Sequence, residues 1–274
     1  MAIYQEFFSL KEAPFNVTSD PNFLFFSRHH KEAYSHFLYG LKERKGFLQI
    51  TGEIGTGKTT LCRALLDSLD QNNTKTAFIL NPNLSALQLL KAIVTDFGIE
   101  SKHRTRMELM EDLNRFLIGQ LTEARNVVLI IDEAQNLSLD VLEQVRMLSN
   151  LETRKEKLIQ IALVGQPQLR EKLEHPSLRQ LKQRIGVRYH IYPLDKEEVG
   201  QYVRHRLRVA GSNGGIVFAP KAIEQIYRYS GGVPRLINLV CDKALLAGYV
   251  YETHTITPEM TKRCIQELER PSSS

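Results

Sequence analysis

A glycine-rich segment, Gly52-Glu-Ile-Gly-Thr-Gly-Lys-Thr59, constrains the fold of this 274-residue chain more than any other feature. An apolar and β-branched run, 47–51, precedes the segment, and residues with helical spacing, 60–69, follow it. Its glycines allow a tight turn that presents backbone N–H groups at the positive end of the helix, where anions are stabilised. A strand, a glycine loop and a helix in this order predict a phosphate-binding loop. A purely structural turn is the alternative for the motif taken alone.

The loop also carries the side chains that a nucleoside triphosphate requires. Lys58 supplies a mobile cation for phosphate oxygens, and Thr59 supplies a hydroxyl ligand for Mg²⁺. We therefore predict that ATP and Mg²⁺ are bound here. The residues expected to bind the nucleotide are Gly52, Glu53, Ile54, Gly55, Thr56, Gly57, Lys58, Thr59 and Thr60.

A second element combines a continuous apolar run, 127–131, with the two carboxylates Asp132 and Glu133. Such a run is typical of a central parallel strand, and open α/β sheets bind their ligands at the carboxyl ends of strands. We expect Asp132 to hold Mg²⁺ through water or Thr59, and Glu133 to polarise the attacking water. Capping of the next helix is the alternative function for the two acids.

Strand and helix patterns alternate through the first two thirds of the chain. Strands are expected at 47–51, 75–81, 127–132, 158–165 and 187–192, with helices between them, which predicts an α/β fold with a five-stranded parallel sheet. From Asp195 onward only helical patterns remain, at about 195–210, 219–230, 233–248 and 257–269. We therefore predict a nucleotide-binding α/β core with an aromatic-rich N-terminal segment over 1–194, and a small all-helical lid over 195–274.

Composition excludes some classes of protein and leaves others open. The apolar runs are far shorter than the roughly 20 residues of a membrane-spanning helix. Residues 1–8 lack the basic region followed by an apolar one that a secretory signal has, so a cytoplasmic protein is expected. Cys62, Cys241 and Cys264 lack metal-ligand spacing and are expected to be free thiols. The pair His29-His30 could suggest a metal, but no carboxylate or cysteine cluster accompanies it, so a structural or surface role is expected. The net charge is +5, and residues 170–190 hold six basic side chains against two acidic ones.

Several motifs together resemble those of an AAA+ ATPase. Gly52 to Thr59 is similar to the Walker A motif, Asp132-Glu133-Ala-Gln135 to Walker B, Val164-Gly-Gln166-Pro to sensor 1, and Gly231-Gly-Val-Pro-Arg235 to sensor 2. Within that superfamily, longer stretches resemble the general secretion pathway protein A (ExeA/GspA-like) ATPases. These stretches are the aromatic segment 4–21, Lys45-Gly-Phe47, 136–143 and 148–152.

The resemblance implies roles for further residues. Gln166, at the sensor 1 position, would read the γ-phosphate or hold the attacking water, with a turn before Pro167 as the alternative. Arg235 would contact the nucleotide from the lid. Arg184 would be an arginine finger acting on the neighbouring subunit, and Arg179 is the second candidate. The alternative is that this stretch is only a solvent-exposed basic face. Asn81 sits where related ATPases carry a polar residue that would restrain the catalytic glutamate until a partner binds, with a turn before Pro82 as the alternative.

The resemblance implies an oligomeric ATPase, a ring or a filament, that serves a bacterial envelope machine such as type II secretion, type IV pili or polysaccharide export. Attachment to the inner membrane would come through a partner or through a C-terminal anchor as in full-length members of the family, of which this chain would be either a short homologue or a truncated piece. The alternative is a DNA-binding ATP switch like transposition regulators and initiator proteins, which the basic stretch 170–190 suits.

Overall fold

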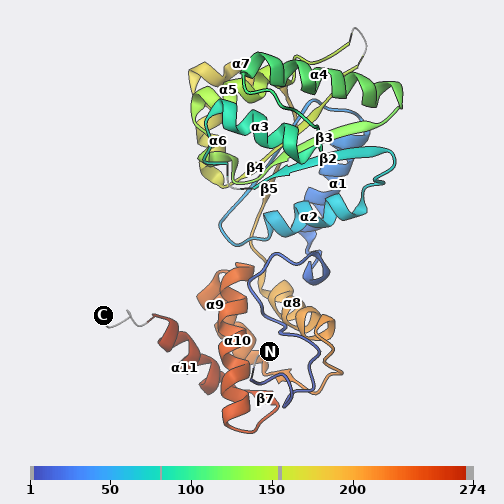
Figure 1. The fold of residues 1–274 in the computed structure, drawn as a ribbon. Helices are drawn as coiled ribbons and strands as arrows, with labels where there is room; N and C mark the ends of the chain where they lie inside the picture. The colour runs from blue at the N-terminus through green and yellow to red at the C-terminus, as the bar shows by residue number, and fades with distance from the viewer. Residues whose placement is uncertain (1–2, 81, 154–155, 270–274) are drawn as a thin grey trace. The chain divides into compact units, whose positions relative to one another are not determined.

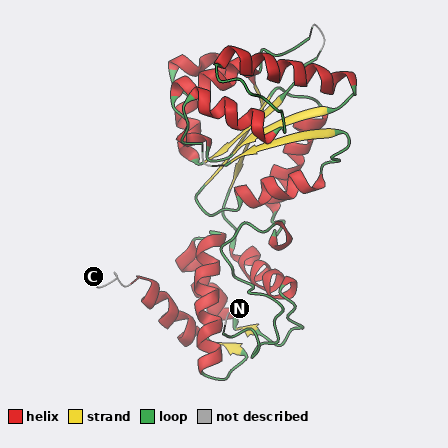
Figure 2. Ribbon diagram, viewed as in Figure 1, coloured by secondary structure: helices red, strands yellow, loops and turns green. Residues whose placement is uncertain are grey.

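The computed structural model describes residues 3–80, 82–153 and 156–269, and it groups them into two compact units. One unit comprises residues 31–52 and 61–191, and the other comprises the N-terminal segment up to His30, residues 53–60 and the chain from Tyr192 onward. Each unit has its own apolar core. Figures 1 and 2 show the elements of both.

The first unit is built on a five-stranded sheet in the order β2-β3-β4-β1-β5, in which all paired strands are parallel. Strands β1, β3 and β4 are the apolar runs of the sequence, and β1 and β4 are buried along their whole length. The predicted α/β fold and five-stranded parallel sheet are thus confirmed. The strands are β1 (Phe47–Gly52), β2 (Thr74–Ile79), β3 (Asn126–Ile131), β4 (Gln160–Gly165) and β5 (Ile185–Ile191).

Helices cover both faces of this sheet. In Figure 1, α1 and α2 lie on one face, and α3, α4 and α5 lie on the other. Capping boxes at Ser85 and Thr105 fix the starts of α3 and α4, because each cap oxygen accepts a hydrogen bond from the backbone three residues later. The bounds are α1 (Arg28–Lys42), α2 (Lys58–Ser68), α3 (Ala86–Asp96), α4 (Arg106–Thr122), α5 (Leu139–Leu148), α6 (Pro167–Leu173) and α7 (Arg179–Arg184), with short 3₁₀ turns η1 (Pro21–Phe23), η2 (Ala134–Asn136) and η3 (Pro176–Leu178).

The second unit contains the four helices that the sequence predicts. Asp195 caps α8 in a capping box with Glu198, and Gly231 ends α9 in the left-handed conformation. One detail was not predicted: a parallel pair of two-residue strands joins this otherwise helical region. The elements are α8 (Lys196–Val209), β6 (Val217–Phe218), α9 (Pro220–Ser230), α10 (Pro234–Val250), β7 (Thr255–Ile256) and α11 (Pro258–Glu269).

The N-terminal segment packs with these C-terminal helices, a grouping that differs from the predicted boundary at 194–195. Phe8, Phe15 and Phe23 are buried in the same apolar cluster as the inner faces of α8 and α10. The guanidinium of Arg206 on α8 is buried as well. It donates to the carbonyl oxygens of Pro14 (2.5 Å) and Asn16 (2.9 Å) and lies 4.3 Å above the Phe23 ring. These contacts hold the segment against the helices.

No helix within the described ranges is long and apolar enough to cross a membrane.

Candidate functional site

The glycine-rich loop follows directly on β1 and leads into α2, as the sequence predicts. It closes on one carbonyl oxygen, that of Glu53, which accepts hydrogen bonds from the Thr56 hydroxyl (2.8 Å), the Thr56 backbone N–H (3.3 Å) and Lys58 Nζ (2.9 Å). Gly55 and Gly57 have φ values of +81° and +93°, where residues with a side chain are strained. Thr59 and Thr60 continue the first turn of α2.

Two elements that are far apart in the sequence contact this loop. His30, at the start of α1, lies 2.9 Å from the carbonyl oxygen of Thr56 through Nε2, and 2.7 Å from the Ser27 hydroxyl through Nδ1. Arg235, on the first turn of α10, donates its backbone N–H to the carbonyl oxygen of Gly55 at 3.2 Å. Since a carbonyl only accepts, Nε2 carries the proton and Nδ1 accepts from Ser27.

Burial lowers the pKa of His30, although the bond to Thr56 opposes the shift. The imidazole is therefore neutral near pH 7, which agrees with the tautomer that its two neighbours require.

Both contacts explain why the loop needs glycine. A Cβ on Gly55 would lie 2.6 Å from the Cβ of Arg235, and a Cβ on Gly57 would lie 3.2 Å from His30 Nε2. The backbone at these two glycines is thus packed closely against Arg235 and His30. A loop of this kind, with its N–H groups at the start of a helix, fits a phosphate chain.

The carboxylates at the end of β3 form a separate polar cluster with the end of β4. Asp132 is buried, and its Oδ1 accepts the backbone N–H of Glu133 at 2.9 Å. Glu133 has φ +54°, a strained conformation for a residue with a side chain. Its Oε2 accepts hydrogen bonds from the side-chain amides of Gln166 (3.1 Å) and Gln135. The structure therefore brings the predicted base and the predicted sensor 1 residue into direct contact.

Gln135 completes this cluster, although no role was predicted for it from the sequence. Its Oε1 accepts the backbone N–H of Gln166 at 3.0 Å, so one side chain links both partners of the contact. Lys172 on α6 donates to the carbonyl oxygens of Gln135 and Leu137, which fixes the turn after β3. A Cβ on Gly165 would lie 2.5 Å from Gln135 Oε1, so only glycine leaves room there.

The two arginines predicted as finger candidates are both exposed and lie on α7. Arg184 donates to the Ser149 hydroxyl at 2.6 Å, at the end of α5. Arg235 also has an exposed side chain, although its backbone contacts the loop. Asn81 lies outside the described residues. The roles predicted for these residues, and for the rest of the site, stay predictions.

Sequence reasoning missed two residues that hold the site. A structural or surface role was expected for His30, yet its ring bonds to the loop. Positions 30, 33, 37 and 41 form the buried face of α1, and this spacing could have indicated that the His30 side chain points into the protein. Gln135 stood within the Walker B-like motif, two residues after Glu133, where a turn returns a side chain towards the strand end.

Comparison with known proteins agrees with this fold and these motifs. Residues 41–173 match the AAA domain family. Among solved structures, Drosophila ORC bound to DNA has a TM-score of 0.73 at 18% identity, covering 99% of this chain and 67% of that chain. Aeropyrum pernix ORC2, in its ADPNP-ADP complexes, has a TM-score of 0.70 at 18% identity over 94% of this chain and 72% of that chain. The Thermotoga maritima RuvB Holliday junction branch migration motor has a TM-score of 0.59 at 19% identity, over 89% and 70%.

At these identities the solved structures describe the fold alone, and together with the domain match they define a P-loop protein of the AAA class. A relative defines the chain further. It is 47% identical over 255 residues to the general secretion pathway protein A of Aeromonas hydrophila. The chain therefore belongs to the GspA-like AAA proteins, which confirms the resemblance found in the sequence. The match covers 93% of this chain and 46% of that protein, so the chain spans about half the length of its relative.

Proposed function

We propose that this protein hydrolyses ATP with the help of Mg²⁺. The observation that carries the proposal is the Glu133 carboxylate, which two amide side chains hold in place directly after a buried parallel strand. A general base must lie within hydrogen-bond distance of the water that attacks the phosphate. The carboxyl end of a strand suits this role, because α/β sheets bind their ligands there. The GspA-like AAA family supports the same reaction.

In this proposal each residue has one task. The loop N–H groups and Lys58 would hold the phosphate oxygens, and Thr59 and Asp132 would hold Mg²⁺, which would neutralise phosphate charge. Glu133 orients the attacking water and takes its proton. Gln166, already bonded to Glu133, keeps that carboxylate oriented.

Glu133→Gln tests the proposal, because it keeps the size of the side chain and removes its basicity. We expect nucleotide binding to be retained and turnover to fall by about 10²–10⁴-fold, the usual contribution of a general base. Glu111→Gln, an exposed substitution on α4, is the control and should leave turnover unchanged. Equal hydrolysis by the Glu133→Gln variant would refute the assignment.

We further propose that the active form is a homo-oligomer in which Arg184 acts on the site of the next subunit. Its exposed position at the end of α7 supports this role. Mixing Arg184→Ala subunits with Lys58→Ala subunits tests it, since some mixed interfaces then join an intact loop to an intact arginine. Activity above that of either variant alone is expected. No recovery at any mixing ratio would contradict a role between subunits.

The similarity to general secretion pathway protein A supports a role in a secretion or related envelope machine, with a protein of that machine as partner. The DNA-binding switch remains the alternative function. Duplex DNA separates the two, because the alternative requires DNA to stimulate hydrolysis with a steep dependence on salt. Hydrolysis that does not respond to DNA at low salt would exclude it.

A further inference from the structure

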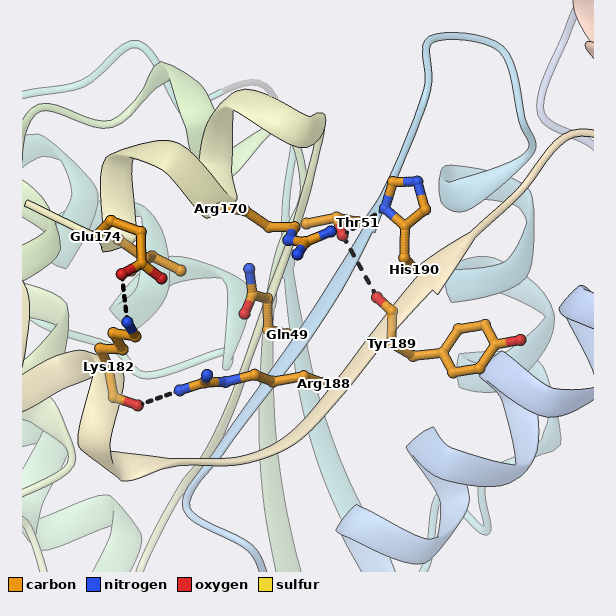
Figure 3. A pocket seen from close by; sticks show the side chains of 9 residues that line it. Gln49, Thr51, Arg170, Glu174, Lys182, Arg188, Tyr189 and His190 are labelled. Atoms are coloured by element: carbon orange, nitrogen blue, oxygen red, sulfur yellow. Dashed lines mark hydrogen bonds and ion pairs between the residues drawn. The ribbon is translucent and has the colours of Figure 1, made fainter.

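A small polar cavity opens beside the edge strand of the sheet, in the unit formed by residues 31–52 and 61–191. It has a volume of about 250 Å³ and lies between β1, β5, α6 and α7 (Figure 3). Gln49 pairs with Arg188, and Thr51 pairs with His190, in the register of β1 and β5. Alternate residues of a strand point to the same face, so these four side chains share one wall of the cavity.

Gln49 is an unusual residue for the middle of a parallel sheet. It lies on β1, between β4 and β5, and is only 5% exposed. Within the described part of the chain, its side-chain amide has no hydrogen-bond partner, and Figure 3 shows it between the side chains of Arg170 and Arg188. Solvent reaches this amide through the cavity that it lines, so a ligand that enters the cavity can bond to it.

The charges around the cavity are mainly positive. Arg170 on α6, Lys182 on α7 and Arg188 on β5 face a single carboxylate, Glu174, which forms an ion pair with Lys182. The bond from Lys182 and then the charges of Arg188 and Arg170 lower the pKa of Glu174, so it stays ionised. One nitrogen of Arg188 donates to the Lys182 carbonyl oxygen at 2.5 Å.

These contacts leave donors available for a ligand. Arg170 has no hydrogen bond or ion pair within the described ranges. The guanidinium nitrogens of Arg188 other than Nη2, which bonds to Lys182, are also available. The cavity therefore offers two guanidinium groups and one amide that come from three elements. Guanidinium groups bind phosphate and carboxylate oxygens through paired hydrogen bonds.

We propose that this cavity binds the terminal phosphate group of a small anion, at a site separate from the glycine-rich loop. Donors that converge from three directions suit a tetrahedral group, and the volume suits a ligand little larger than the phosphate itself. Gln49 is only 5% exposed, whereas Arg170 and Arg188 are exposed, so the amide is the least accessible of the three donors. A terminal phosphate reaches it, whereas a phosphate within a nucleic-acid strand carries a sugar on each side. This cavity thus gives a function to part of the basic stretch 170–190.

Calorimetric titration of the full chain with inorganic phosphate tests the proposal, at constant ionic strength. We expect saturable binding that Gln49→Leu and Arg188→Gln each weaken by roughly tenfold, the effect of losing one bond to a charged group. Arg179→Gln removes a charge from the same basic stretch but does not line the cavity, and it should change affinity by less than about twofold. Lys58→Ala should also retain this binding, which separates the cavity from the loop and from ATP hydrolysis.

Three results would overturn the proposal: no saturable binding to the wild type, equal losses in Arg179→Gln and Arg188→Gln, or loss of binding in Lys58→Ala. If Gln49→Leu unfolds, Arg170→Gln provides the same test, because its side chain is exposed. A last arm uses duplex DNA as competitor. DNA that displaces phosphate from the wild type would show that the site accepts strand phosphates, and would refute a site for small anions.

Discussion

Replacement of His30 separates a role in the glycine-rich loop from a role in packing. The side chain is 3% exposed and bonds to the Ser27 hydroxyl and to the carbonyl of Thr56, itself a buried residue. In His30→Ala that carbonyl loses its partner, which costs about 1–3 kcal/mol. The space left by the ring adds about 1 kcal/mol. We therefore expect the free energy of unfolding to fall by about 2–4 kcal/mol, as measured by denaturant titration.

The same change should weaken nucleotide binding, because Thr56 lies within the loop. A loss of about 1.4 kcal/mol in binding free energy, because the loop no longer has a fixed conformation, corresponds to a tenfold weaker affinity for Mg-ADP. His30→Gln keeps an N–H group that can donate to Thr56, so it should recover most of the affinity. His175→Ala, an exposed substitution, is the control. If His30→Ala is destabilised but binds Mg-ADP as tightly as the wild type, His30 is only a packing residue and the reasoning is refuted.

His30 also predicts how stability depends on pH. Burial lowers its pKa in the folded protein, whereas the unfolded chain takes up a proton near pH 6.5. The unfolded state then binds more protons below this pH, so the stabilisation is complete above about pH 6.5 and is lost as the pH falls towards the folded pKa. Burial lowers the pKa of His205 too, so the informative quantity is the difference between wild type and His30→Gln. Identical pH profiles for the two would contradict this account.

Other substitutions test neighbouring parts of the structure. Gln166→Ala removes a donor to Glu133, so kcat for ATP hydrolysis should fall by about 10–100-fold with little change in KM; a change in KM alone would contradict its role. Gly232→Ala would place a Cβ 1.9 Å from a backbone oxygen and should cost about 3 kcal/mol or more in thermal unfolding. Gly231 also has a positive φ, but a Cβ built there has no described atom within 4 Å, so Gly231→Ala should cost only about 1 kcal/mol. Equal losses of stability in Gly231→Ala and Gly232→Ala would contradict the steric explanation. Arg206→Met leaves two carbonyls of the N-terminal segment without their donor and should lower stability by about 2–4 kcal/mol in denaturant titration, and unchanged stability would count against that anchor.

The fold was largely predictable because its strongest local patterns agree with its tertiary structure. Strands β3 and β4 are short apolar runs, and burial on both faces of a parallel sheet requires that composition. The caps at Asp195 and Ser138 are likewise set by local chemistry. The pair β6 and β7 was missed because each strand has two residues, too few for any alternation of side chains to be visible.

The N-terminal segment shows where local patterns stop being informative. Its aromatic residues predict burial, but nothing in them indicates which surface buries them. Phe23 and the carbonyl of Pro14 find their partner in Arg206, nearly two hundred residues later, a basic residue on a helix whose other charged side chains are mostly exposed. Such a contact depends on how distant elements pack.

The candidate site divides in the same way. The types of residue at 58, 59, 132 and 133 follow from motifs, because phosphate and Mg²⁺ accept few kinds of partner. The bonds that orient them do not follow. Gln166 meets Glu133 only because β3 and β4 are neighbours in the sheet, and Gln135 lies between them only because Gly165 leaves room.

The glycine-rich loop illustrates the consequence. In the sequence it belongs to the strand before it and the helix after it, which is why it predicts an α/β core. In the structure two of its carbonyl oxygens are bonded to other elements, that of Gly55 to the backbone of Arg235 and that of Thr56 to His30. The loop therefore groups with the N-terminal segment and the C-terminal helices. Because Arg206 joins those two in turn, any rearrangement of the loop backbone must break or carry with it contacts to both.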